Sequence, residues 1–394
     1  WATAVAVALS PISLATSAMF QYVAFDFLWW VVLAWLVAEA SATDDPRWWM
    51  PIGAVIGLGV LTKYTIAFLI AGIVAAVLLT PLRSHLRSRW LWIGVAISIA
   101  IAAPNILWQI RHDWISLDFL EHIHERDVRI GRTEGFWVEQ LFVAASPVTI
   151  PLWAAGLAVL FFSSRFRRFR AIGVMAIVPV ILFAVAQGRG YYTAPVYPSL
   201  IAAGASAFGL WWPGWGRAAR TAAVVAAAVL LLVGMAGSLV VLPLAPVGSP
   251  VWNAAIRVNG DFVEQLGWEE LTAEVARIWS SLPEDERVRT GIFASNYGEA
   301  GAINLYGPAL GLPRAMSGVN SFWYRGWDDA ETLIVLGAER EDLEEVCSQV
   351  TLAGHARNRW NVANEESRDH PEIFLCRGMK VELSKVWKDL RSFG

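Results

Sequence analysis

The stretch from Trp48 to Thr80 reads WWMPIGAVIGLGVLTKYTIAFLIAGIVAAVLLT, and its only charged side chain is Lys63. One straight helix of this length would run about 50 Å, well beyond a hydrocarbon core of about 30 Å. A lysine at the centre of a bilayer costs about 3 kcal/mol. We therefore predict that the helix breaks at Lys63 into two short spans, which places the ammonium group at a membrane surface.

Apolar runs of this kind fill the first 245 residues. The chain is 56% hydrophobic and 16% charged, whereas soluble domains are about 25% charged. This composition excludes a soluble, disordered or fibrous protein and predicts an α-helical polytopic membrane protein. With 48–80 counted as two spans we expect about nine crossings, from apolar segments at 2–18, 22–40, 48–80, 90–108, 136–162, 171–186, 191–211 and 219–243.

Arginine clusters predict how these spans are oriented, because loops rich in Lys and Arg stay in the cytoplasm. With nine crossings the clusters fall on one side, and they are Arg83/Arg87/Arg89, Arg165/Arg167/Arg168/Arg170 and Arg217/Arg220. The outer side then holds Asp26, Lys63, loop 109–135, Arg189 and the polar tail. We expect the inner membrane of a bacterium, with the tail extracytoplasmic.

Residues 246–394 form a second domain in this interpretation, after a transmembrane domain at 1–245. Short β-rich runs alternate with helical patterns, which predicts a compact extracytoplasmic α/β domain. The expected strands are 288–294, 331–337, 350–355 and 372–376, and the expected helices are 263–280, 297–306 and 340–347. Cys347 and Cys376 are compatible with free thiols or with one bridge; for an outer domain we predict the disulfide, with a Cα separation below about 7 Å.

The outer loop between two spans carries most of the candidate chemistry. Its segment 117–127 reads LDFLEHIHERD, which predicts a helix lying on the membrane surface. A carboxylate beside an imidazole, as at Glu121 and His122, is able to bind a divalent metal. The alternative is an amphipathic helix whose charges pair with one another, and there is no HExxH or CxxC spacing to decide between them.

A second candidate is the segment 187–198, QGRGYYTAPVYP. Arg189 lies in a glycine turn, and on the outer face Arg189 and Lys63 are suited to hold a phosphate. The alternative is a tight turn with an interfacial arginine. Asp26 is an isolated acid at the end of a span, where a plain boundary residue is the commoner case.

Taken in order along the chain, these motifs resemble the bacterial family 39 membrane glycosyltransferases, which include protein O-mannosyltransferases and aminoarabinose transferases. The resemblance rests on short elements: Gly57-Leu58-Gly59-Val60-Leu61-Thr62-Lys63-Tyr64, Glu121-His122-Ile123, Gly190-Tyr191-Tyr192-Thr193-Ala194-Pro195-Val196-Tyr197-Pro198, Asn296-Tyr297-Gly298-Glu299-Ala300 and Leu305-Tyr306-Gly307-Pro308. It implies a GT-C fold and a sugar transferase that uses a polyprenyl-phosphate donor and a lipid, glycan or protein acceptor.

Carried over to this chain, the resemblance implies that Lys63, Arg189, Tyr191 and Tyr192 face the lipid phosphate. It also implies that Glu121 and His122 border the cavity, with Glu121 near substrate and a divalent metal as the possible cofactor. The family's principal catalytic acid lies in the first outer loop, which we expect upstream of Trp1 in an N-terminally truncated chain. Asp26 is then the candidate acid within the sequence.

Two other functions remain open at this point. A lipid or glycan transporter would use the outer cations as a gate, but such proteins usually show internal repeats, and we find none. A non-catalytic assembly protein would bind a partner through its tail. The net charge of −3 gives no reason to expect nucleic acid as a partner.

Overall fold

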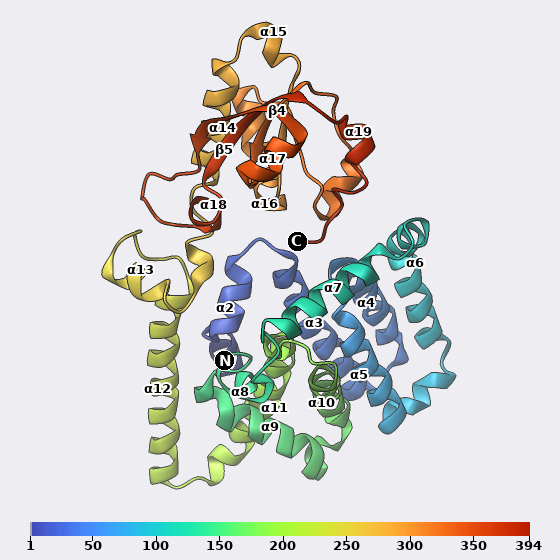
Figure 1. The fold of residues 1–394 in the computed structure, drawn as a ribbon. Helices are drawn as coiled ribbons and strands as arrows, with labels where there is room; N and C mark the ends of the chain where they lie inside the picture. The colour runs from blue at the N-terminus through green and yellow to red at the C-terminus, as the bar shows by residue number, and fades with distance from the viewer. Residues whose placement is uncertain (1) are drawn as a thin grey trace. The chain divides into compact units, whose positions relative to one another are not determined.

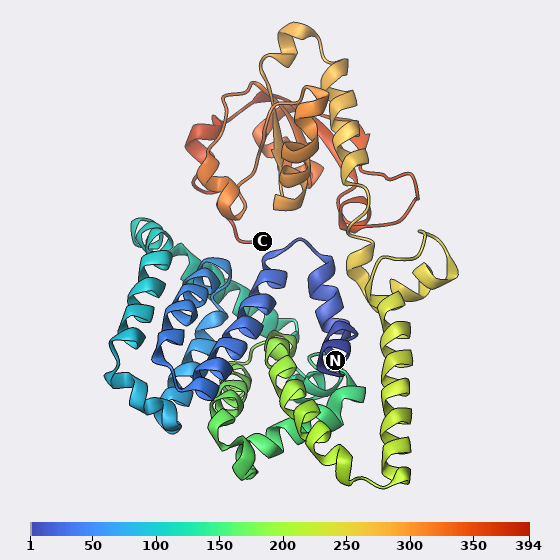
Figure 2. The ribbon, with the colours of Figure 1, turned by 180° about the vertical axis from the view of Figure 1, so that it is seen from behind.

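The computed structural model describes residues 2–394 and divides into two compact units, Trp1–Leu244 and Ala245–Gly394. The first unit is helical and the second holds a small sheet (Figures 1 and 2). The helices of the first unit are α1 Ala2–Ala8, α2 Pro11–Ala18, α3 Tyr22–Thr43, α4 Trp49–Thr62, α5 Ile66–Leu79, α6 Arg89–Arg111, α7 Ile115–Arg129, α8 Phe136–Phe142, α9 Ile150–Phe162, α10 Arg170–Val185, α11 Tyr197–Trp211 and α12 Arg217–Val241.

Short 3₁₀ segments join several of these helices. Those used below are η2 Pro81–Arg87, η3 Pro147–Thr149, η4 Ser164–Phe169 and η5 Gly190–Val196. Between residues 2 and 394, four helices are long and apolar enough to cross a membrane, and up to six if each sharply bent pair is one span. This is consistent with a polytopic membrane protein, whereas the count of nine crossings stays a prediction.

The predicted break at Lys63 is confirmed. Helix α4 ends at Thr62, Lys63 is extended with φ −159° and ψ 134°, and α5 begins at Ile66. Each of the two helices is about 21 Å long at 1.5 Å per residue, shorter than the hydrocarbon core.

Three other predicted spans are interrupted, and proline is present at each interruption. The run 2–18 splits before Pro11 into α1 and α2. The run 136–162 splits around η3, where Pro147 lies, and its halves are bent by 76°. The run 191–211 begins as η5, which contains Pro195, before α11 starts. Proline removes a backbone donor and clashes with the preceding turn, and neighbouring helices must satisfy the freed groups.

Close helix crossings in the first unit depend on paired glycines. A Cβ on Gly94 of α6 would lie 2.1 Å from the Trp49 carbonyl oxygen on α4, and a Cβ on Gly204 of α11 would lie 1.9 Å from the Leu152 carbonyl oxygen on α9. Small residues let backbones approach closely where helix packing, and not water exclusion, drives association. Helix α12, by contrast, is almost entirely exposed in the structure.

The second unit contains a five-stranded sheet of order β2-β1-β3-β5-β4. Strands β1, β2 and β3 are parallel, and β5 runs antiparallel to both β3 and β4. The elements are α13 Pro250–Ala255, α14 Trp268–Ser281, α15 Glu284–Arg287, β1 Thr290–Ala294, α16 Tyr297–Tyr306, β2 Ala315–Met316, β3 Thr332–Leu336, α17 Arg340–Val346, β4 Cys347–His355, α18 Glu365–Arg368, β5 Glu372–Met379 and α19 Leu383–Val386.

Alternating side chains of the central strands build a core on each face of this sheet. Ile334 and Leu336 of β3 belong to one buried cluster, and Leu333 and Val335 belong to another. Helices α14 and α16 contribute to the first cluster, and α17 contributes Leu343 to the second. Because both faces are covered, β3 is buried at every position and reads as a continuous apolar run. Such short apolar runs, and not an alternation, marked the expected strands.

Two sequence expectations for this unit need correction. The helix expected at 263–280 begins only at Trp268, because Gly267 adopts a left-handed φ of 97° that a continuous helix does not tolerate. The short strand β2 was not expected at all. It has only two residues and pairs with β1 at the edge of the sheet, so it carries almost no periodic signal.

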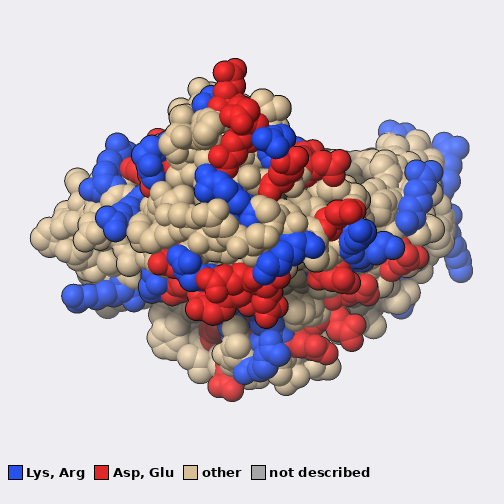
Figure 3. Space-filling view, turned by 45° about the horizontal axis from the view of Figure 1, so that its top comes forward, with Lys and Arg blue, Asp and Glu red and all other residues tan. Residues whose placement is uncertain are grey.

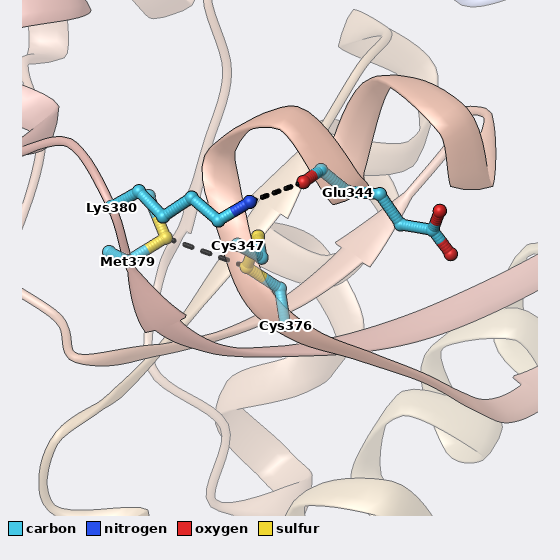
Figure 4. The surroundings of a disulfide bond; sticks show 5 residues. All are labelled: Glu344, Cys347, Cys376, Met379 and Lys380. Atoms are coloured by element: carbon cyan, nitrogen blue, oxygen red, sulfur yellow. Dashed lines mark hydrogen bonds between the residues drawn. A yellow bond between two sulfur atoms is a disulfide. The ribbon is translucent and has the colours of Figure 1, made fainter.

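The disulfide between Cys347 and Cys376 is confirmed, with a Cα separation of 5.7 Å. It joins the start of β4 to β5, and both cysteines are buried (Figure 4). Met379 and Lys380 lie beside it, and Lys380 donates to the Glu344 carbonyl oxygen at 2.6 Å. The face drawn in Figure 3 carries acidic and basic residues side by side, together with large areas that carry neither.

Candidate active site

Lys63 lies between α4 and α5, at a position where the backbone is extended and not helical. Its Nζ is 3.9 Å from the centroid of the Tyr192 ring and 5.6 Å from that of Tyr22. These are cation–π distances. Within residues 2–394 Lys63 forms no salt bridge with a carboxylate, and the rings of Tyr192 and Tyr22 are its contacts at short range.

Asp26 lies one turn into α3 and is only 5% exposed. The Trp30 indole donates to Oδ1 and the Thr65 hydroxyl donates to Oδ2, each at 3.1 Å. Thr65 is two residues beyond Lys63, so the acid and the cation are held in one locality. The structure thus buries Asp26 and orients both of its oxygens, which a plain boundary residue would not require.

Arg189 binds a residue to which the sequence assigned no role. Its Nε and Nη2 each donate to Asp127 of α7 at 2.6 Å, a two-pronged contact. Burial alone would raise the pKa of the Asp127 carboxyl, but the hydrogen bonds from Arg189 and the charges of Arg126 and Arg132 outweigh it and hold that pKa below its ordinary value. Asp127 is therefore ionised at neutral pH and fixes the guanidinium.

Tyr191 and Tyr192 follow Arg189 directly. The Arg189 Nη1 donates to the Tyr191 hydroxyl at 3.0 Å, and the two tyrosine rings meet edge to face at 4.7 Å. The Arg189 guanidinium carbon lies 5.9 Å from the Tyr192 ring centroid. Tyr192 thus lies against both cations, which joins the Lys63 segment to the Arg189 segment.

Gln140 of α8 holds the tyrosine segment in place. Its Nε2 donates to the Gly190 carbonyl oxygen at 3.0 Å, while its Oε1 accepts from Thr193 at 2.6 Å and from Tyr197 at 2.9 Å. Glu139, the preceding residue, lies against Gly190, where a Cβ would be 2.4 Å from Glu139 Oε2. That oxygen is buried and has no hydrogen-bond partner in the described chain.

A second polar network ties the break to α6 and α7. Tyr64 donates to Asn105 Oδ1 at 3.0 Å and accepts from Gln109 Nε2 at 2.9 Å, and Gln109 also donates to Ser116 at 2.5 Å. Ser116 lies in the first turn of α7. The helix that supplies Asp127 is therefore anchored to the residue next to Lys63.

The structure does not add Glu121 or His122 to this cluster. Both lie on the exposed surface of α7, while Asp127, two turns further along, is buried. Among residues 2–394 no three His, Cys, Asp or Glu side chains gather as a metal site. The metal role of Glu121 and His122, and the substrate role of Glu121, stay predictions.

Asp127, Gln140 and Glu139 were the site residues that sequence reasoning missed. The loop 109–135 is crowded with acids, so no pattern in it distinguishes the one that meets Arg189. A buried arginine does need an acidic partner, and that rule was the available signal. Asp127 was one of several acids that satisfied it.

Residues 1–108 match the family model described as dolichyl-phosphate-mannose-protein mannosyltransferase. A lipid A galacturonosyltransferase, RgtD, from Rhizobium johnstonii is 30% identical over 107 residues, which are 26% of this chain and 22% of that protein. The match thus spans about a fifth of the length of this relative. Both names are those of glycosyltransferases. No solved structure matches the chain.

The matched region includes Asp26 and Lys63 but ends before α7, Arg189 and the tyrosines. The similarity supports a membrane glycosyltransferase; the family match covers only α1 to α6 of this chain. The cluster itself is defined by the geometry described above.

Proposed function

We propose that this chain is a membrane glycosyltransferase that moves a sugar from a polyprenyl-phosphate donor to a lipid, glycan or protein acceptor at the outer face of a bacterial inner membrane. The single observation that carries the proposal is the meeting of Lys63, Arg189 and the two tyrosines at one end of α5 and α10. The similarity of residues 1–108 to glycosyltransferases supports it.

The cluster suits a lipid-linked phosphate because of its charge and its position. Lys63 is held by aromatic rings, so an incoming phosphate does not have to displace a carboxylate from it. Asp127 fixes the orientation of the Arg189 guanidinium. The Tyr191 hydroxyl accepts from Arg189 Nη1, and the Tyr192 ring lies beside the same guanidinium. Charge-assisted hydrogen bonds of this kind are about twice as strong as neutral ones.

In the proposed reaction the acceptor oxygen attacks the anomeric carbon of the sugar. The bond from that carbon to the phosphate oxygen breaks, and the polyprenyl phosphate leaves with the electron pair. Lys63 and Arg189 stabilise the negative charge that develops on the departing phosphate. Asp26 is the candidate base that takes the acceptor proton, and its two hydrogen bonds hold the carboxylate in a defined orientation.

The test measures transfer of radiolabelled sugar from polyprenyl phosphate to acceptor in membranes that contain the protein. We expect Lys63→Met and Arg189→Gln each to lower kcat by about 10²- to 10³-fold, and Asp26→Asn by at least about 10²-fold. Arg111→Gln is the matched control, because Arg111 ends α6 as an exposed cation. Unchanged transfer in the Lys63 and Arg189 variants would overturn the assignment.

The same membranes separate this function from transport. A fluorescent polyprenyl-phosphate analogue and a membrane-impermeant quencher report movement between leaflets. Movement that depends on Lys63 and Arg189 in the absence of any sugar transfer would show a flippase and reject the transferase.

A further inference from the structure

A cleft lined by arginines lies at the end of α5 and α10 that the candidate active site does not use. Its volume is about 950 Å³. We call it the arginine cleft, and the lining residues that matter here are Arg83, Arg87, Arg167, Arg170, Leu79 and Leu86. All of them belong to the first unit, in η2, in η4 or at the adjoining helix ends.

The packing of α5 against α10 places this cleft and the active site at opposite ends of one helix pair. Phe68 stacks on Phe183 with ring centroids 4.0 Å apart, and a Cβ on Gly72 would lie 3.1 Å from the Met175 carbonyl oxygen. Residue numbers therefore rise along α5 as they fall along α10, and the helices are antiparallel. The end of α5 consequently meets the start of α10, about 21 Å from Lys63 by helix rise.

The two ends of the α5–α10 pair differ in how their arginines are neutralised. At the active-site end Arg189 forms a salt bridge with Asp127. At the other end Arg83, Arg87, Arg167 and Arg170 form no salt bridge with any carboxylate of the described residues. Four guanidinium groups that share one cleft repel one another, so an anion in the cleft lowers the electrostatic energy.

Hydrogen bonds within the protein hold the segments that line the cleft in place. His85 of η2 is 4% exposed; its Nδ1 accepts from the Trp49 indole and its Nε2 contacts Asp44 Oδ1, each at 3.0 Å. Across the cleft, Arg170 Nη2 donates to the Phe161 carbonyl oxygen at 2.9 Å. Its Nε is buried and has no hydrogen-bond partner within residues 2–394.

We propose that the arginine cleft binds the phosphate headgroup of an anionic phospholipid in the leaflet that meets this end of the bundle. Arginine forks match phosphate oxygens in pairs, and basic pockets between membrane helices are known to hold such headgroups. Leu79 is 74% exposed and Leu86 is 37% exposed beside the arginines. An apolar rim of this kind suits the glycerol and acyl region of a lipid better than a free phosphate ion.

The experiment titrates the purified full chain with cardiolipin, phosphatidylglycerol or phosphatidylcholine and counts bound lipid by native mass spectrometry. The test variant is Arg83→Gln/Arg87→Gln/Arg167→Gln. The matched control is Arg89→Gln/Arg165→Gln/Arg168→Gln, which removes the same charge from η4 and the start of α6 but does not line the cleft. We expect at least a tenfold loss of anionic-lipid affinity in the test variant alone.

A charge-retaining variant and a competition with inorganic phosphate test the geometry of the site and the identity of its ligand. Arg83→Lys/Arg87→Lys/Arg167→Lys keeps the charge but loses the forks, and we expect binding between that of the wild type and that of the glutamine variant; its thermal unfolding checks that the fold survives. Equal losses in the test and control variants would show diffuse charge attraction and overturn the site. Displacement of the lipid by inorganic phosphate at millimolar concentration would overturn the lipid as the ligand.

Discussion

The contact between Arg189 and Asp127 gives the sharpest test of how the first unit is built. Replacing Asp127 with Asn keeps the shape and one acceptor oxygen but removes the negative charge. The two side chains are 16% and 6% exposed, so the guanidinium of Arg189 would be left without its counter-charge in a poorly solvated place.

The expected cost follows from that burial. Breaking a buried pair by removing one partner costs about 3–5 kcal/mol. Arg126 and Arg132 also approach Asp127, at 3.9 and 3.8 Å, and lose attraction as well, while the retained amide oxygen recovers part of one hydrogen bond. We therefore expect Asp127→Asn to lower the free energy of unfolding by about 3 kcal/mol.

Reversible unfolding of the protein in mixed detergent micelles, titrated with sodium dodecyl sulfate, measures this free energy. Asp118→Asn is the control, because it makes the same change at an exposed position of the same helix, and we expect less than about 0.5 kcal/mol. The double variant with Arg189→Gln should cost at least about 1.5 kcal/mol less than the sum of the singles. Additive effects, or a cost below about 1 kcal/mol for Asp127→Asn, would refute the reasoning.

Three further predictions concern other parts of the chain. Burial raises the pKa of Glu299 from 4.5 to about 8, so the folded state keeps a proton that the unfolded state has lost. The stability of the second unit should therefore fall from pH 5 to pH 8 by on the order of 3 kcal/mol. Burial also raises the pKa of Glu366, so Glu299→Gln, unlike the exposed Glu269→Gln, should weaken the trend in hydrogen exchange of β1 without removing it. Replacing Cys347 and Cys376 with Ala removes the crosslink between positions 29 residues apart in the second unit. In denaturant titrations this should lower the free energy of unfolding of the second unit by about 3.5 kcal/mol, and an unchanged midpoint would contradict the prediction. Gly94→Ala should destabilise the first unit by about 2 kcal/mol or more because its Cβ meets the Trp49 carbonyl, whereas Gly209→Ala, whose Cβ would meet nothing within 4 Å, should be neutral in the same detergent titration.

Much of the architecture was predictable because it depends on local signals. Lys63 in a long apolar run interrupts one helix. Short β-rich runs mark β1, β3, β4 and β5, and two cysteines in a domain expected to be extracytoplasmic form a disulfide. Asn296 caps α16, and its side chain accepts from the Glu299 backbone N–H at 2.8 Å. Gly267 and β2 were missed because a single left-handed residue and a two-residue strand produce no period.

The candidate site was only half predictable. Asp26, Lys63, Arg189, Tyr191 and Tyr192 stand out in sequence as polar groups in apolar surroundings, yet nothing in their spacing shows that Tyr192 lies over Lys63. That contact joins positions more than a hundred residues apart.

The sequence by itself determined which segments are apolar enough to enter a membrane, where lysine and proline interrupt them, and that a separate α/β unit follows. These are properties of single residues and of short periods. Only the tertiary structure decided that Asp127, among the many acids of its loop, neutralises Arg189. It also decided that four arginines at the far end of α5 and α10 form no salt bridge with a carboxylate within residues 2–394. Charge pairing depends on distance in space, and in this chain antiparallel helix packing sets that distance.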